Sequence, residues 1–268
     1  GGVLYVLVQQ EDARWPSLAE TPRVSSPVMP VVGDGRAFEQ LETASALFPS
    51  DAPDFDAILA REGTPSADVL MAWQPFVGRI DTLRELVTQT SGLVIPQPQR
   101  FDDPGVSLLP LLKVSRAWLL SAWAHAATGA PARGVTEMLH VQALAVRLMT
   151  GSTGLVDTMV GLAIHERARR ELRELLATFG PTDPALYAHA AAGMVPLEPG
   201  SVARSLVVEA NGVEALFASQ LSDMGWIEAW GYDEALTRVW YRMHMQRVVN
   251  QAMTPRWERT PLERLPVW

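Results

Sequence analysis

The chain has 268 residues, of which 48% are hydrophobic, and it carries a net charge of -8 with no cysteine. So much apolar material excludes disorder over most of the chain and is enough for a substantial core. The negative charge argues against a general nucleic-acid binder, because such proteins concentrate positive charge to displace counterions from phosphates. Without cysteine there can be no disulfide, thiolate metal site or cysteine nucleophile.

The chain starts with a short apolar run that stops at polar residues. The run consists of Val3, Leu4, Tyr5, Val6, Leu7 and Val8. It is shorter than the roughly 20 residues that cross a bilayer. Two interpretations stay open: residues 1–12 are the end of a membrane anchor, or the run is an apolar strand or chain end. The anchor would place residues 13–268 outside the cytoplasm, since Arg14 is the only positive residue near it.

Residues 13–35 contain four prolines, which limit helix formation and predict a linker or an extended arm. The next region, 36–254, is predicted to be a single all-helical domain, because helical spacing recurs along it and no strand-like alternation of useful length appears. Its first part is expected to hold short helices over 36–48, 55–62, 67–74 and 77–89.

Residues 108–128 are apolar almost all round, which is typical of a helix surrounded by other elements. We expect this to be the central helix. Gly129 and Pro131 follow it, a pairing that is common where one helix ends and another begins. So short a connection predicts antiparallel neighbours.

Two further helices are predicted after this turn. Apolar residues at helical spacing mark the first over 135–149, and Gly151 with the following hydroxyl residues is expected to end it and cap the next. The last helix begins at Leu155. Its first half is very apolar and is expected to be buried, whereas its second half is rich in arginine and glutamate and is expected to emerge into water.

This part of the chain resembles a known class. The likeness covers 119–128, 134–151, the run 154–164 and the Arg/Glu/Leu-rich helix that follows. These segments resemble helical-hairpin proteins, relatives of the tetratricopeptide class, which planctomycetes and myxobacteria encode as membrane-anchored or exported proteins of unknown function. The resemblance implies a helical scaffold. The 34-residue repeat of true tetratricopeptide proteins is absent. The predicted fold is therefore all-α: antiparallel hairpins packed as a tetratricopeptide-like or irregular bundle around the central helix.

Several polar residues are candidates for chemistry. Glu137 and His140 have the Glu-x-x-His spacing of di-iron bundles, but the second copy that such a site requires is missing. His165 and Glu166 begin like a zinc-protease helix, yet arginine occupies position 169, so both are assigned to a solvated charged face. We therefore expect no catalytic residues, no cofactor and no metal.

A further candidate is Glu209, in a helix predicted over 202–222. It lies on the apolar stripe between Leu206 and Val213, where a charge is expected to be buried and paired with an arginine; a carboxylic acid with a raised pKa in a cleft is the other interpretation. A last helix is predicted over 234–253.

The C-terminal tail, 255–268, alternates prolines with large apolar residues. Those residues are Trp257, Leu262, Leu265 and Trp268. The tail either packs on its own domain or binds a partner, since a stiff apolar segment loses little entropy on docking. The predicted function is a non-catalytic scaffold or accessory subunit of a membrane complex in the bacterial cell envelope, exposed to the periplasm, with protein partners and no nucleic acid. The alternative is a helical enzyme, either a hydrolase or metal-dependent.

Overall fold

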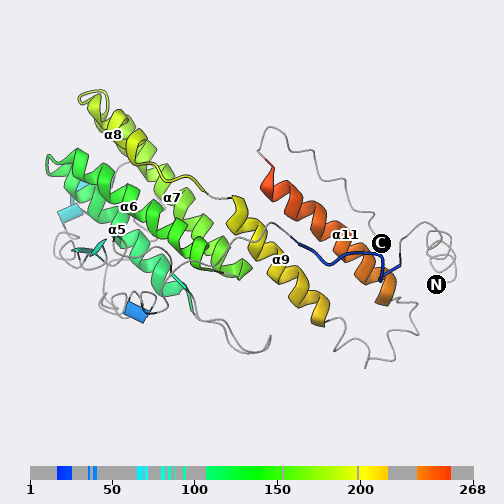
Figure 1. Ribbon diagram of the computed structural model, residues 1–268. Coiled ribbons are helices and arrows are strands. Elements are labelled where there is room, and N and C mark those ends of the chain that lie inside the picture. Colours follow the sequence, from blue (N-terminus) through cyan, green and yellow to red (C-terminus); the bar gives the residue numbers. More distant parts are fainter. Residues whose placement is uncertain are drawn as a thin grey trace. The chain divides into compact units, whose positions relative to one another are not determined.

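The computed structural model describes residues 17–25, 107–152, 154–197, 199–216 and 234–254, with shorter pieces earlier in the chain. Those pieces are residues 36, 39–40, 65–68, 70–71, 80–81, 84–85, 88 and 93–94. Across this described part the protein is all-helical, as the sequence predicted (Figure 1).

Six helices have defined bounds. They are α5 (Leu109–Ala127), α6 (Pro131–Gly151), α7 (Leu155–Phe179), α8 (Ala185–Gly193), α9 (Pro199–Leu216) and α11 (Glu234–Met253). The predicted bounds of α5 are right to within one residue at each end, and those of α11 to the residue.

The chain divides into two compact units, not the single domain predicted over 36–254. One unit comprises Gly1–Met29 with Pro199–Trp268, and the other comprises Pro30–Glu198. The second boundary lies between Glu198 and Pro199, where α9 begins. In the first of these units, residues 17–25 of the predicted linker contact α9 and α11, so they belong to the same unit as helices far along the chain.

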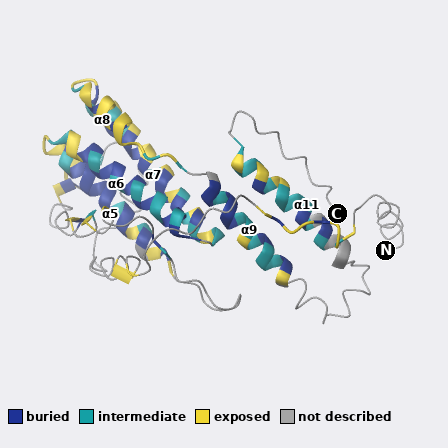
Figure 2. Cartoon of the chain, viewed as in Figure 1, coloured by how far each residue is buried: buried dark blue, intermediate teal, exposed yellow. Residues whose placement is uncertain are grey.

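The core of the unit Pro30–Glu198 is formed mainly by α5, α6 and α7. Every residue from 117 to 124 is buried, including two tryptophans, Trp118 and Trp123 (Figure 2). Helix α6 packs against α5 and α7, and α8 packs mainly on α6. Most of the buried apolar residues of α5 and α6 belong to one continuous cluster.

The turn between α5 and α6 follows the predicted chemistry. Gly129 has a φ of 90°, a left-handed conformation that glycine adopts without steric cost. Its N–H donates to the Ala126 carbonyl at 3.2 Å, and the N–H of Ala130 donates to the His125 carbonyl at 2.9 Å. These two bonds close a Schellman motif, and Pro131 then begins α6.

The break between α6 and α7 is built differently from the prediction. Gly154, which has no side chain, is the N-cap of α7. The Ser152 hydroxyl accepts from the Gly154 N–H at 3.2 Å and donates to the Asp157 carboxylate at 2.9 Å. The first half of α7 is also not wholly buried, because Val156 is 68% exposed and Met159 is 59% exposed. The helix has one buried face along its length, and its start is apolar all round, so some apolar side chains must face outward.

Gly134 sets how closely α5 and α6 approach each other. A Cβ atom at this position would lie 2.7 Å from the Ala122 carbonyl oxygen of α5, which is closer than real Cβ contacts. Gly212 of α9 has no such neighbour within 4 Å of the same position. The two positions can therefore be compared directly, because packing excludes a side chain at position 134 but not at position 212.

We expect Gly134→Ala to lower the melting temperature and Gly212→Ala to leave it unchanged or raise it. Overpacking costs about 1 to 3 kcal/mol, whereas replacing a free helical glycine by alanine gains about 0.5 to 1 kcal/mol. Thermal unfolding followed by circular dichroism measures both. Equal effects of the two substitutions would contradict the proposed close approach at Gly134.

Candidate functional site

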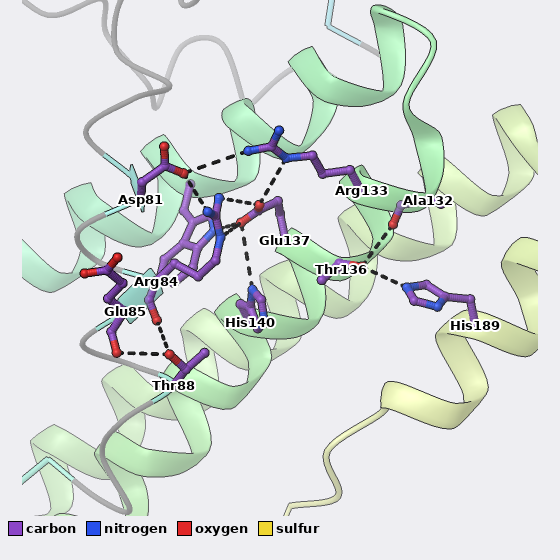
Figure 3. A network of polar contacts seen from close by, with 11 residues as sticks. Asp81, Arg84, Glu85, Thr88, Ala132, Arg133, Thr136, Glu137, His140 and His189 are labelled. Atoms are coloured by element: carbon purple, nitrogen blue, oxygen red, sulfur yellow. Dashed lines mark hydrogen bonds and ion pairs between the residues drawn. The ribbon is translucent and has the colours of Figure 1, made fainter.

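A network of polar contacts surrounds the Glu137 carboxylate on α6, which is 2% exposed (Figure 3). Arg84 donates to both of its oxygens, from Nε to Oε2 at 3.1 Å and from Nη2 to Oε1. Trp118 of α5 donates its indole N–H to Oε2 at 2.6 Å. One carboxylate thus holds together α5, α6 and the helical residue Arg84.

A second layer of charges balances this centre. The Nε atom of Arg133 lies 3.8 Å from Glu137 Oε1, and Asp81 Oδ1 accepts from Arg84 Nη1 at 2.5 Å. Asp81 also lies 3.9 Å from Arg133 Nη2. Two arginines therefore face two carboxylates, so the cluster is close to neutral.

The environment fixes the charge of Glu137. Burial alone would raise its pKa, but His140, Trp118 and Arg84 outweigh that effect and lower the pKa to about 2. The carboxylate is therefore ionised at any physiological pH. It has no proton to give, and its oxygens are already engaged by donors.

The geometry does not favour the metal interpretation of Glu137 and His140. The Nδ1 atom of His140 lies 3.9 Å from Glu137 Oε2, beyond hydrogen-bond distance, and its ring stands 6.1 Å from that of Trp118 between centroids. A bound guanidinium would repel a cation at the same carboxylate. Within the residues that the structure describes, no three histidine, aspartate or glutamate side chains are grouped as a metal requires.

A second buried carboxylate, Glu171 of α7, repeats part of this arrangement. Trp123 of α5 donates its indole N–H to Oε2 at 2.9 Å, and Arg167 Nε lies 2.9 Å from Oε1 as an ion pair without hydrogen-bond alignment. Burial raises the pKa of Glu171. The sequence had placed this residue in the solvated half of α7, whereas it is 4% exposed.

The other unit has its buried carboxylate at Glu214, not at Glu209. Glu209 is only partly buried, whereas Glu214 is 4% exposed and pairs with Arg242 and Arg238 of α11. The reason is the rotation of α9: its most buried positions include 203, 210 and 214, one step round from the stripe through Leu206 and Val213. Arg242 in particular lowers the pKa of Glu214.

His165 is also buried, contrary to its assignment to a charged face. It is 5% exposed, its Nε2 lies 3.5 Å from the Val195 carbonyl, and burial lowers its pKa, so it is neutral at pH 7. Its neighbour Glu166 is exposed, as expected, and accepts from Arg169 at 3.1 Å. Periodicity could have found His165, which lies one residue from Ile164 and three from Ala168 on the buried face of α7.

Two sets of predicted residues lie outside the described part of the chain: the apolar run at 3–8 and the tail residues Trp257, Leu262, Leu265 and Trp268. Among the helices that the structure does describe, none combines the length and apolar character needed to cross a bilayer.

We expect Glu137→Gln to destabilise the protein at pH 7 by roughly 3 kcal/mol, because a pKa of about 2 against 4.5 in the unfolded chain corresponds to that free energy. The stabilisation is fully present above pH 4.5 and is lost as the pH falls towards 2. The difference between wild type and variant should therefore shrink over that interval. Urea unfolding at several pH values measures it.

Glu171→Gln is the matched control, since this carboxylate also accepts an indole N–H and faces an arginine. Its raised pKa means that ionisation opposes folding, and more so as the pH rises. We expect the neutral isostere to change the free energy of unfolding at pH 7 by less than about 1 kcal/mol. A cost as large as that of Glu137→Gln would contradict the raised pKa of Glu171.

Comparison with protein families, with curated proteins and with solved structures gave no match. The function is therefore inferred from the chain's own residues.

Proposed function

We propose that this chain is a non-catalytic helical scaffold or accessory subunit of a membrane-associated complex in a bacterial cell envelope. The observation that supports the proposal is that the buried carboxylates bind donors of the same chain. Each of three buried glutamates is paired with an arginine, and each accepts a hydrogen bond from a separate part of the fold. These glutamates are Glu137, Glu171 and Glu214. Their role is to hold helices in place.

Catalysis by any of these groups would need an oxygen or a proton directed at a substrate. Both oxygens of Glu137 accept hydrogen bonds from within the protein. The alternative, a helical enzyme, has one observation in its favour, which is the raised pKa of Glu171. That carboxylate is nevertheless 4% exposed, with Trp123 and Arg167 against its two oxygens.

A contact surface is available on the first turns of α7. Val156 and Met159 are three residues apart, so they share one face of the helix, and both are more than half exposed. Exposed apolar groups that lie together are typical of protein contact sites. The apolar run at 3–8 and the tail at 255–268 supply further contact candidates, and the membrane anchor and periplasmic location are proposed from that run.

We expect the double substitution Val156→Glu and Met159→Glu to release the protein from its native complex without lowering its melting temperature. The matched control is Arg173→Glu, at an exposed position of the same helix, which changes the net charge by the same two units. The tagged full chain would be purified from native membranes and its bound proteins compared. Unchanged association of the double variant would contradict this contact surface.

Metal analysis of the purified protein separates the scaffold from a metal-dependent enzyme. The scaffold proposal expects no stoichiometric iron, manganese or zinc. One equivalent of such a metal that is lost on Glu137→Gln or His140→Ala would overturn it.

A further inference from the structure

Residues 17–25 form a segment that we term the arm, and it lies against α9 and α11 of its own unit (Figure 1). The arm begins with a compact turn over residues 17–20 and continues without regular structure to residue 25. In the turn, the Ser17 N–H donates to the Glu20 carboxylate at 2.9 Å and the Glu20 N–H donates to the Ser17 hydroxyl at 3.3 Å. The arm and the helices it contacts are separated in sequence by the whole of the other unit.

The helices hold the arm mainly through its backbone. Gln246 of α11 bonds Ser25 in both directions: its Oε1 accepts from the Ser25 N–H at 2.9 Å, and its Nε2 donates to the Ser25 carbonyl at 2.9 Å. Asn211 of α9 donates to the Val24 carbonyl at 3.4 Å. Side chains that read the main chain of an extended segment are a recurring mode of peptide recognition.

Arg242 anchors the other end of the arm. Its Nη1 donates to the Leu18 carbonyl at 3.0 Å and to the Thr21 carbonyl at 2.6 Å. The opposite edge of the guanidinium is fixed by Glu214, which accepts from Nε at 2.9 Å and from Nη2, and which also accepts from Arg238 at 2.9 Å. The donor that faces the arm is therefore held in position by a buried ion pair.

One side chain of the arm enters the apolar core of its unit. Val24 is 3% exposed and belongs to a buried cluster with Ala203, Ala210 and Val249. Val24 therefore packs among small and branched aliphatic residues of α9 and α11, and we term this arm-binding surface the groove. Pro22 restricts the backbone before it, which lowers the entropy lost on docking.

We propose that two copies of this chain exchange their arms, each placing residues 17–25 in the α9–α11 groove of the other. The arm of a second copy fits the same surface, because it carries the same backbone groups and the same valine. Exchange needs no new complementarity and is a low-cost route to dimers. The outer end of the arm, at Ser25, is exposed, so release can begin there. This inference deepens the proposed scaffold function and rests on it.

Two complementary variants of the full chain test the exchange. Val24→Asp disables the arm and leaves the groove open, whereas Ala210→Leu with Gln246→Ala fills the groove and removes its backbone contacts while leaving the arm intact. We expect each variant alone to be monomeric in light scattering. Mixed in equal amounts, they should give a species of about twice the 29.3 kDa of one chain.

A binding measurement keeps the test decisive if a groove variant fails to fold. A labelled peptide of residues 17–25 should bind the Val24→Asp chain at least tenfold more tightly than wild type, whose groove is occupied. The wild-type mass should rise towards the dimer with concentration. Arm exchange is overturned if the wild type and the mixture of variants both remain monomeric, even if the peptide binds. That outcome would leave the metal analysis and the complex-release test of the scaffold function unaffected.

Discussion

The unit Pro30–Glu198 depends on one buried charge, the Glu137 carboxylate. Removing a carboxylate from water costs several kcal/mol, and this cost is offset only when donors and an opposite charge are in place. Here the donors come from Trp118 of α5 and from Arg84, far apart in sequence. Any packing of these elements that separates them leaves the charge unpaired. The Glu137 interaction therefore selects one arrangement of these elements over others.

The carboxylates of Glu137, Glu171 and Glu214 illustrate how the number of donors decides the direction of a pKa shift. Glu137 and Glu214 each receive several hydrogen bonds, including a two-pronged contact from an arginine, and both have lowered pKa values. Glu171 receives one aligned hydrogen bond, from Trp123, and an ion pair without alignment; burial dominates and its pKa is raised. Two tryptophans of α5 thus donate similar hydrogen bonds to carboxylates whose pKa values shift in opposite directions.

Local chemistry was predictable from the sequence where a few adjacent residues determine it. Gly129 and Pro131 identified the turn between α5 and α6, and Asp233, as an expected N-cap, marked the start of the helix observed as α11. Contacts across the sequence were not predictable in this way. Glu137 was singled out together with His140, three residues away, whereas its main partner, Arg84, is 53 residues distant.

The burial of charged residues was likewise not predictable from the local sequence. Glu171 lies among arginines and glutamates that are typical of a solvated face, but it is buried and accepts a hydrogen bond from Trp123 of α5. On α9 the apolar stripe could be drawn through Leu206 or one residue further, and the orientation towards α11 selects Glu214 over Glu209. A hydrophobic pattern gives the period of a helix, but the neighbouring helix determines which of two adjacent stripes is buried.

The arm differs from these contacts in the length of chain it closes. Glu214 and Arg242 are 28 residues apart, whereas Arg242 and Thr21 are 221 apart. Counted as flexible loops, the second closure costs roughly 2 kcal/mol more than the first, because the entropic cost rises with the logarithm of loop length. The pair α9 and α11 can therefore form first and present Arg242, held by Glu214, to a segment that arrives later. The long closure also reduces the advantage that a chain's own arm has over the identical arm of a second copy.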